Sequence, residues 1–473
     1  MHVISMIVIL LSVNYVFPRQ SDYCSADDDD PYLNMATKTA YDFIRGRQGD
    51  IQSVPNCQPL QIWMLARYGT RYPEKKNTMK LLELKNMRDQ IVRNHETRRS
   101  GKLCRSDLDN LKQWAPHQNM TIDMSQQLTP QGEEDNILLA RRLKSHFPEL
   151  LQPKKYDITS QNYIFKSVKN DRSINSMKAF MEGLFGSKYA VDTISPNEDD
   201  TLLQPYKNCT KWENGDETDP PTLAEHNKFK NSEEFKNLIY NVSRRIGFQY
   251  DLSSDVLLSM YELCRFEKSW ILNNLSPWCA VFSKDELKIL EYYEDLDYYY
   301  RAGNGRKVNK LIGCFPLQDM VNNFRSLERG DTEGKPKGIF YFSNSKTIIS
   351  FLSTMDIMPN QNPLTSDNYK DNIKRQWRTS KIDPFSSNIV AVFYRCKEEK
   401  ESPNKVMFYL QEKPLLYEGC QVGLCDWEYL KNKFGSIANE CSIDACDNKN
   451  IAVLYKTSTV MIMSFVVLLL IKH

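Results

Sequence analysis

Two arginines four residues apart, Arg67 and Arg71, are the side chains whose type and spacing most clearly suit anion binding. They stand in the stretch RYGTRYP at residues 67–73, directly after the apolar run LQIWMLA at residues 60–66. Such an apolar strand is expected to be buried, and Gly69 lets the backbone turn sharply behind it. Guanidinium groups donate in a planar fork that fits phosphate oxygens, and open α/β sheets bind ligands beyond the carboxyl ends of their strands. We therefore predict a phosphate site here, with a structural ion-pair role for both arginines as the alternative.

The elements that must position these arginines are strands that alternate with helices. β-prone apolar runs predict strands at residues 60–66, 163–168, 338–343, 389–394 and 406–411. Helical spacing of apolar residues predicts helices at residues 78–92, 127–151, 174–185 and 346–354. Thr129 and Pro130 suit the cap and first turn of the second helix, and Arg172 falls in the turn before the third. This alternation predicts an α/β sheet domain whose last two strands form an antiparallel hairpin.

A long stretch with a different pattern interrupts these elements. Residues 187–335 are first polar and rich in Asn, Asp and Pro, and then helical in periodicity with many aromatic residues. They predict a mainly helical insert, whose tyrosines at 292, 293 and 298–300 are expected to serve helix packing. The chain is thereby divided into a signal peptide (1–20), an N-terminal extension (21–56), the first part of the α/β core (57–186), the insert (187–335), the second part of the core (336–440), and a spacer with a hydrophobic tail (441–473).

The two ends of the chain are apolar and predict entry into the secretory pathway. Residues 3–17 form one apolar run of signal-peptide length, with an uncleaved membrane anchor as the alternative. Residues 457–471 form a second apolar run, followed only by Lys472 and His473. This run is short for a membrane span, so we expect a removed signal for a glycolipid anchor, with a short tail anchor as the alternative.

Cysteines, glycosylation sequons and charge point to the same compartment. The twelve cysteines include no Cys-x-x-Cys pair, so disulfides are expected, with no metal site and no cofactor. Sequons occur at Asn119, Asn208 and Asn241, and at Asn274 in a form weakened by Pro277. The net charge of +2 argues against nucleic acid as a partner, and the acidic run at residues 27–30 is expected to be solvated. We expect a protein that is extracellular, on the cell surface or in the lumen of the endoplasmic reticulum.

The stretch at residues 67–73 resembles the Arg-His-Gly-x-Arg-x-Pro signature of the histidine acid phosphatases, with Tyr68 in place of the nucleophilic histidine. Three further stretches resemble the multiple inositol polyphosphate phosphatase branch of that family: SPWCAVF at 276–282, LTSDNYK at 364–370 and PFSSN at 384–388. The resemblance implies a mixed sheet flanked by helices, a helical insert with a Cys264–Cys279 disulfide, and a phosphomonoesterase that acts on inositol polyphosphates.

The resemblance also assigns roles to single residues. It implies that Arg67, Arg71 and Arg172 hold phosphate and that Lys76 is a further basic group of the site. In the place of the family's Phe-Gly-His-Ala-Glu-Thr stretch stands FSNSKT at residues 342–347. Asn344 thus replaces the second histidine, and Lys346 replaces the proton donor and is expected to add positive charge to the pocket.

These substitutions predict a loss of catalysis. A tyrosine hydroxyl has a pKa near 10, so we expect Tyr68 to stay mostly protonated at neutral pH. Losing a nucleophile costs about 10⁴-fold in rate, and losing a general acid costs a further ~10²- to 10⁴-fold. Four histidines remain away from the two ends, and none is expected at a strand exit: His95, which we expect in a surface loop, His117, His146 and His226.

Three functions are compatible with these residues. The leading hypothesis is a phosphatase homologue that binds an inositol polyphosphate or another phosphate anion with little or no hydrolysis. The alternative is an active phosphomonoesterase that uses Tyr68 or water to release phosphate from inositol polyphosphates or bisphosphoglycerate. A scaffold without a ligand is the third possibility.

Overall fold

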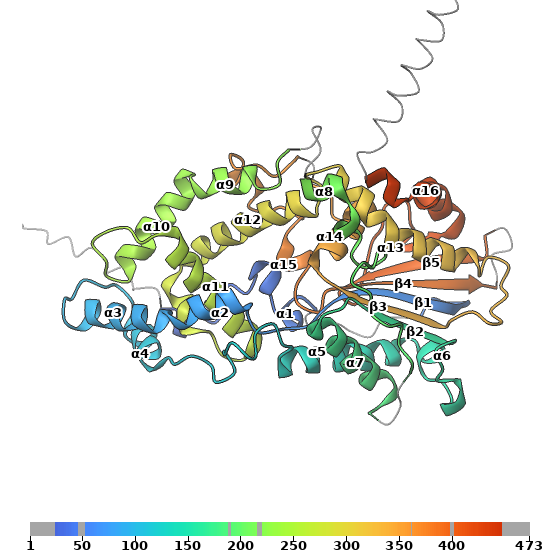
Figure 1. Cartoon of the computed structure of the whole chain (residues 1–473), viewed down its shortest axis with the longest axis horizontal. Helices are drawn as coiled ribbons and strands as arrows, with labels where there is room; N and C mark the ends of the chain where they lie inside the picture. Colours follow the sequence, from blue (N-terminus) through green and yellow to red (C-terminus); the bar gives the residue numbers. More distant parts are fainter. Residues whose placement is uncertain are drawn as a thin grey trace, which may run out of the picture.

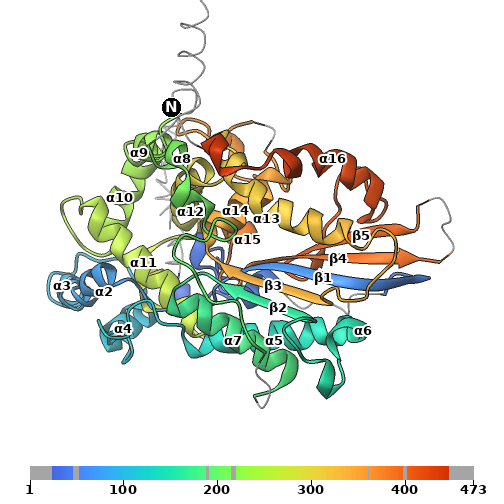
Figure 2. The same cartoon turned by 45° about the vertical axis from the view of Figure 1, so that its right-hand side comes forward.

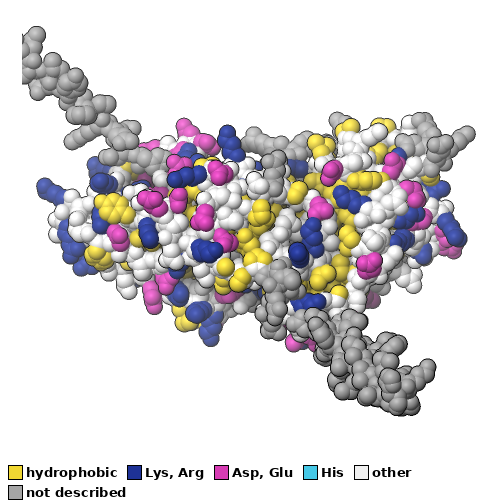
Figure 3. Space-filling view, turned by 90° about the horizontal axis from the view of Figure 1, so that it is seen from above, with side chains coloured by type: hydrophobic (Ala, Val, Ile, Leu, Met, Phe, Trp, Pro, Cys, Tyr) yellow, Lys and Arg dark blue, Asp and Glu magenta, His cyan; other side chains and the backbone are white. Residues whose placement is uncertain are grey.

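A computed structural model describes residues 24–45, 53–187, 191–214, 220–360, 362–397 and 402–446. The predicted signal peptide and the apolar tail at residues 457–471 lie outside this part of the chain. Within it, no helix combines the length and the apolar character needed to cross a membrane. Acidic and basic side chains are interspersed over the face shown in Figure 3, in keeping with the small net charge.

The centre of the molecule is a seven-stranded mixed sheet (Figure 1). The strands follow the order β2-β3-β1-β4-β5-β6, and β7 pairs with β5. β1 and β2 both run parallel to β3, whereas β4 is antiparallel to β1 and to β5. The predicted mixed sheet and its hairpin are therefore confirmed. The bounds of the strands are β1 Cys57–Arg67, β2 Tyr163–Ser167, β3 Gly338–Ser343, β4 Asn388–Cys396, β5 Asn404–Leu410, β6 Lys413–Pro414 and β7 Leu424–Asp426.

The parallel register brings three strand ends to one edge of the sheet. Arg67 at the end of β1 lies opposite Ser343 at the end of β3, and Ser167 at the end of β2 lies opposite Phe342. Residues that follow these strands therefore meet at the same edge. Tyr68 and Asn344 are the first residues beyond their strands, so the register alone makes them neighbours.

Helices cover both faces of the sheet, as Figure 2 shows. One face carries α5 (Pro130–His146), α6 (Pro148–Leu151) and α7 (Asp171–Phe185). The opposite face carries α13 (Val308–Arg325), α14 (Ser345–Thr354) and α16 (Trp427–Glu440). This arrangement confirms the predicted sheet flanked by helices.

The remaining helices pack together to one side of the sheet (Figure 1). They come from three parts of the sequence, because helices before and after the predicted insert join those of the insert: α2 (Lys75–Leu82), α3 (Leu84–Glu96), α4 (Arg105–Gln113), α9 (Ala224–Lys230), α10 (Glu233–Arg245), α11 (Ser254–Trp270), α12 (Lys284–Arg301) and α15 (Thr379–Ile382).

Helix α13 is not part of this helical group, although its residues lie in the insert predicted at 187–335. It packs on α14 and α16 and so belongs to the cover of the sheet. Gly313 permits this packing, since a Cβ atom there would lie 2.2 Å from the backbone oxygen of Ser350 in α14.

The N-terminal extension is an integral part of the fold. Cys24 forms a disulfide with Cys104, and Lys284 pairs with Asp28 at 3.0 Å, so the acidic run at residues 27–30 is only partly solvated. This corrects the expectation of a wholly solvated run. The extension continues through η2 (Ala36–Lys38), which lies beside the end of β1, into α1 (Tyr41–Arg45).

Capping explains where the helices around the site begin. The Thr129 hydroxyl accepts a hydrogen bond from the Gly132 amide at 3.1 Å, so α5 begins at Pro130 as predicted. The Asn170 side chain caps α7 by accepting from the Ser173 amide at 2.9 Å. Arg172 therefore lies in the first turn of α7, not in the turn before the helix. The predicted helices at 78–92 and 127–151 are each divided in two, at Glu83 and at Phe147.

All twelve cysteines lie in the described residues and form six disulfides. The predicted Cys264–Cys279 pair is confirmed. The other five pairs, which the sequence left open, are Cys24–Cys104, Cys57–Cys396, Cys209–Cys446, Cys314–Cys441 and Cys420–Cys425.

We predict that Thr129→Ala destabilises the protein by about 1–2 kcal/mol, because Ala cannot cap α5. The Thr129 hydroxyl also donates to the Thr70 carbonyl at 3.0 Å, so the change weakens the loop of the candidate site as well. The measurement is the shift in urea midpoint. Thr129→Ser keeps the hydroxyl and should stay near the natural protein; an equal loss in both variants would contradict the capping role.

Candidate functional site

Tyr68 lies at the end of β1 with three guanidinium groups around its ring. The guanidinium carbons of Arg172, Arg67 and Arg71 are 4.7, 5.0 and 5.7 Å from the centre of the Tyr68 ring. Arg67 and Arg71 come from the strand exit, and Arg172 comes from α7 beside it. The structure thus brings together the three arginines predicted to hold phosphate, with Tyr68 in their midst.

Gly69 explains how this cluster is packed so tightly. A Cβ atom at Gly69 would lie 2.6 Å from the carbonyl oxygen of Gly132 in α5, and one at Gly132 would lie 2.2 Å from the Thr70 oxygen. Two glycines therefore let α5 press against the strand exit. The Gly69 amide donates to the Ser176 hydroxyl at 2.9 Å, which ties the exit to α7 and so to Arg172.

Arg67 forms two hydrogen bonds and an ion pair with neighbouring residues of the protein. It donates two hydrogen bonds of 2.7 Å to the carbonyls of Thr37 and Asp383, and it lies 3.4 Å from the Asp383 carboxylate. Burial raises the pKa of Asp383 to about 6, although Arg67 opposes this shift. The structural ion-pair alternative is therefore observed for Arg67, but its Nε has no hydrogen-bond partner among the described atoms.

Arg71 and Arg172 are held more loosely. Arg71 donates to the Tyr72 carbonyl at 2.9 Å and lies 3.8 Å from the exposed Glu74 carboxylate. Arg172 donates to the Gln126 side chain. As with Arg67, the buried Nε atoms of both residues have no hydrogen-bond partner among the described atoms. Buried Nε atoms without an acceptor, on three arginines that surround one ring, suit an anion.

Lys76 stands apart from this cluster. It is exposed in the first turn of α2, whereas Arg67 and Arg71 are buried. It remains a predicted phosphate-binding residue that the folded chain does not tie to the others.

The arginines change the acid–base chemistry of Tyr68. Burial raises the pKa of the phenol, but the charges of Arg71, Arg67 and Arg172 outweigh burial and lower the pKa of Tyr68 to about 6. This shift runs against the expectation that Tyr68 is mostly protonated at neutral pH. The pKa falls because three positive charges, one of them from α7, act on one buried oxygen.

Asn344 and Lys346 do not face this cluster as catalytic groups would. The Asn344 amide donates to the Tyr206 hydroxyl at 2.8 Å, and its oxygen caps α14 by accepting from the Lys346 amide at 3.1 Å. The Lys346 ammonium lies 4.5 Å from the Tyr206 ring centre and 4.7 Å from that of Trp212. Lys346 thus lies against a pair of aromatic rings, and the addition of its charge to the arginine pocket stays a prediction.

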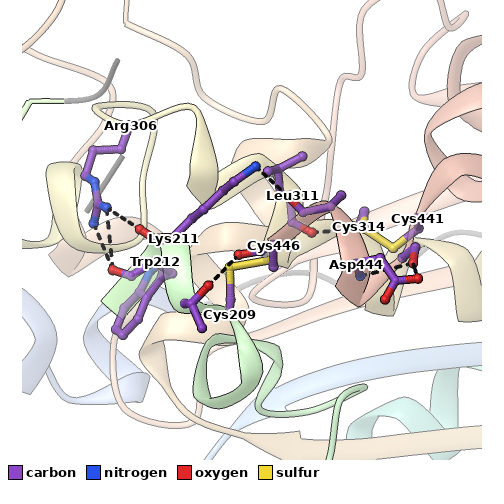
Figure 4. The surroundings of a disulfide bond; sticks show 12 residues. Cys209, Lys211, Trp212, Arg306, Leu311, Cys314, Cys441, Asp444 and Cys446 are labelled. Carbon is purple, nitrogen blue, oxygen red and sulfur yellow. Dashed lines mark hydrogen bonds between the residues drawn. A yellow bond between two sulfur atoms is a disulfide. The ribbon is translucent and has the colours of Figure 1, made fainter. Parts of the chain in front are cut away.

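Tyr206 and Trp212 belong to a strap that crosses this edge of the sheet, formed by η4 (Pro205–Asn208) and α8 (Thr210–Asn214). Cys209 binds the strap to Cys446 in η7 (Ile443–Cys446), as Figure 4 shows. In the same view Arg306 reaches the Trp212 carbonyl. Lys346, which replaces the proton donor, therefore packs against an anchored aromatic strap.

A cavity of about 350 Å³ lies between α2, α11 and α12. Tyr298 in its wall is near enough to Arg67 and Tyr68 for their charges to affect its pKa, which burial raises most and Glu294 raises further. The other charged groups of the wall are mixed in sign: Lys38, Lys80, Arg265, Asp255, Glu262, Glu294 and Asp297.

The structure shows three neighbours of the site that the sequence did not single out. Tyr206 lies in a polar stretch with no recognisable signal, whereas Tyr298 was assigned to helix packing with its neighbours. Asp383 directly precedes the PFSSN stretch, so that motif could have pointed to it. Only the tertiary contacts assign these residues to the site.

The histidines lie outside the arginine cluster. His95 is in α3 rather than in a loop, and its Nδ1 contacts the Ile91 carbonyl at 2.8 Å. His117 comes nearest to the motif, with its ring centre 6.0 Å from that of Tyr72. His226 stacks on Tyr293 in the wall of the cavity.

The predicted glycosylation sites differ in accessibility. Asn241 is exposed, whereas Asn119 and Asn208 are half-buried. The Asn119 amide donates to the Tyr72 hydroxyl at 3.0 Å, which brings this side chain close to the motif.

Comparison with known proteins places this site in a family. The family profile described as Histidine phosphatase superfamily (branch 2) matches residues 60–411. Multiple inositol polyphosphate phosphatase 1 of Drosophila melanogaster is 33% identical over 440 residues, covering 92% of each chain. The chain belongs to the multiple inositol polyphosphate phosphatase branch of the histidine phosphatase superfamily. The human protein of the same name is 28% identical over 405 residues, covering 81% of this chain and 80% of its relative.

Solved structures agree with this fold. The phytase from D. castellii matches this chain with a TM-score of 0.70 at 16% identity, covering 88% of this chain and 87% of that chain. The multiple inositol polyphosphate phosphatase of Bifidobacterium longum, solved in complex with inositol hexasulfate, matches with a TM-score of 0.61 at 14% identity, covering 85% and 97%. At these identities the likeness concerns the fold alone.

We predict that Tyr68 is a phenolate in the folded protein at pH 7.5. The ultraviolet absorbance of tyrosinate should be present in the native protein, absent in Tyr68→Phe, and lost from the natural protein when urea unfolds it. Equal spectra for the two folded proteins would contradict the lowered pKa.

The lowered pKa of Tyr68 should also make the free energy of unfolding depend on pH. Because the pKa of Tyr68 is lowered on folding, its contribution is complete above the unfolded pKa near 10 and is lost as the pH falls through about 6. The free energy of unfolding of the natural protein, relative to Tyr68→Phe, should rise between pH 6 and 9 by up to roughly 1.4 kcal/mol per pH unit. A constant difference would contradict the prediction.

Proposed function

We propose that this protein binds an inositol polyphosphate or another phosphate anion at Arg67, Arg71 and Arg172 with little or no hydrolysis. One observation carries the proposal: three guanidinium groups surround the residue that follows β1. Their buried Nε atoms have no acceptor among the described atoms. Desolvated positive charges of this kind are stabilised by an anion.

The absence of turnover is supported by what surrounds the cluster. Asn344 is engaged with Tyr206 and with the start of α14, and Lys346 is held against two rings. Asp383 is fully buried and faces Arg67, so it is poorly placed to give a proton to a leaving group. No described side chain next to Tyr68 thus replaces the missing proton donor.

The class of ligand is inferred from the relatives and the adjacent cavity. The relatives are named for inositol polyphosphates, and one solved structure holds inositol hexasulfate. The cavity wall carries both cations and carboxylates. It therefore suits a ligand that presents one phosphoryl group to the arginines and further polar groups to the wall.

We also propose that the protein acts in the secretory pathway, at the cell surface or in a lumen. Six disulfides support this location, because such bonds persist in oxidising compartments. The apolar tail at residues 457–471, outside the described residues, is the proposed lipid-anchor signal. Release of the expressed protein from cells by a phospholipase that cleaves glycolipid anchors tests the anchor.

A second candidate function is an active phosphomonoesterase with Tyr68 as its nucleophile. The observation that favours it is the lowered pKa of Tyr68, since a phenolate is a far better nucleophile than a phenol. Continuous release of phosphate from inositol hexakisphosphate, lost in Tyr68→Phe, would establish this activity.

We predict that inositol hexasulfate binds to the purified protein and that Arg172→Gln weakens binding about tenfold to a hundredfold, the share of a charge-assisted hydrogen bond. Titration calorimetry measures the affinity. Arg105→Gln is the matched control, because the Arg105 side chain is 95% exposed and remote from the motif in sequence. No binding by the natural protein, or the same loss in both variants, would refute the proposed site.

We predict that binding of inositol hexasulfate tightens several-fold as the pH falls from 8 to 5. Sulfate esters keep their charge over this range, whereas Tyr68 loses its negative charge below about pH 6 and no longer competes for the arginines. Tyr68→Phe should show a flatter profile, since histidines titrate in both proteins alike. Parallel profiles for the two proteins would contradict this competition.

A further inference from the structure

Positive charge is concentrated in one stretch of the chain. Residues 75–112 contain eleven Lys and Arg and five Asp and Glu, a local net charge of +6 in a chain whose net charge is +2. At the end of α3 and in the loop behind it, four basic side chains are exposed: Arg93, Arg98, Arg99 and Lys102. Figure 3 shows basic side chains at the end of the molecule where Figure 1 places α3. We call the surface of these four residues the cationic end.

The charges of the cationic end have no acidic partners. Arg93, Arg99 and Lys102 form no side-chain hydrogen bond or ion pair within the described residues. Arg98 donates to the oxygen of a neutral side-chain amide at 3.2 Å. Glu96, the one acidic residue of this stretch, is paired with a lysine of α4 at 2.5 Å. Unpaired cations gathered on one surface attract a ligand with several negative charges.

A cavity of about 540 Å³ extends this surface onto α10. Its wall includes Lys102, Arg244 and Arg245, and no carboxylate is among the described residues that line it. Neutral polar side chains complete the wall, namely the hydroxyls of Ser100 and Ser283 and the amides of Asn241 and Gln249. The cavity therefore suits a ligand that combines anionic groups with hydroxyl groups.

Two cations of the wall are oriented by acidic residues outside it. Arg244 lies 3.2 Å from the Asp251 carboxylate, and Arg245 donates to Glu286 at 2.6 and 3.0 Å. A guanidinium group has five N–H donors, so each arginine keeps donors for a further anion.

The loop of the cationic end is fixed against α10. The Lys102 amide donates to the Arg245 carbonyl at 2.8 Å, and the Ser100 hydroxyl donates to the Gly247 carbonyl at 2.9 Å. A Cβ atom at Gly247 would lie 2.7 Å from the Cβ atom of Asn94, so glycine permits this close packing. A surface whose backbone is fixed in this way loses less conformational entropy when a ligand binds.

We propose that the cationic end and the adjoining cavity bind a sulfated polysaccharide. Such a polymer presents successive sulfate groups to the unpaired cations and hydroxyl groups to the neutral side chains of the wall. Six disulfides favour it over nucleic acid, because these bonds persist in oxidising compartments. The inference goes beyond the proposed function and concerns a surface away from the end of β1 (Figure 1).

The test measures affinity for immobilised heparin, a sulfated polysaccharide, by surface plasmon resonance. Every protein is the full chain with Asn241→Gln, which removes the predicted glycan beside the cavity and keeps an amide. The triple variant Arg98→Gln, Arg99→Gln, Lys102→Gln should bind about tenfold to a hundredfold more weakly at 0.15 M salt. The slope of log affinity against log salt should fall by about three, roughly one for each lost cation.

A matched control removes the same charge elsewhere. Lys154→Gln, Lys178→Gln, Arg329→Gln replaces three exposed cations of segments around the sheet and should leave the affinity nearly unchanged. An equal loss in both triple variants, or no binding of heparin by the parent protein, would overturn the assignment.

Two further measurements separate the alternatives. Duplex DNA with the same number of charges should bind at least about tenfold more weakly than heparin, and equal affinity would overturn the choice of a sulfated polysaccharide. Arg172→Gln should leave heparin binding unchanged, and a loss as large as that of the triple variant would overturn the location. This inference and the proposed function therefore fail independently.

Discussion

The mutual repulsion of three guanidinium groups at one strand end is the constraint on which the rest of the site depends. Arg67 and Arg172 lie within 5.0 Å of the Tyr68 ring centre, and Arg71 within 5.7 Å. Burial and the charge of Arg71 lower the pKa of Arg172, although Tyr68 raises it. Charges so placed in a poorly solvated site need an anion close by, and the protein supplies one in Tyr68.

The chain compensates the three charges unequally. Arg67 is held by Asp383 and by the Thr37 carbonyl of the N-terminal extension, so it also serves the fold. Arg71 and Arg172 have weaker partners, namely an exposed glutamate and the side-chain oxygen of Gln126. The two looser arginines are therefore the ones most available to an external anion, and the phenolate of Tyr68 is what that anion must displace or join.

Residues 344 and 346 contact the strap formed by η4 and α8. Lys346 packs against Tyr206 and Trp212, and the Cys209–Cys446 disulfide fastens this segment to the end of the described chain. The substitutions at 344 and 346 are thus parts of one packing arrangement.

Alternating apolar runs and short motifs are local signals, so the sequence alone predicted the α/β sheet, its flanking helices and the candidate arginines. The resemblance to the family added the mixed sheet, the Cys264–Cys279 pair and the replacement of reactive groups by Tyr68, Asn344 and Lys346. The register of β1 on β3 could not be read from the sequence, nor could the contacts of Asp383, Tyr206 and Tyr298.

The lowered pKa of Tyr68 and the contacts of Lys346 depend on the tertiary structure. The pKa of a phenol depends on charges that converge from separate elements, and here α7 adds Arg172 to the two arginines of the strand exit. The Lys346 side chain packs against Tyr206 and Trp212, which lie on a strap far earlier in the chain. The sequence shows which side chains are present. Their pKa values and packing depend on distances to residues that are far away in the sequence, and folding sets those distances.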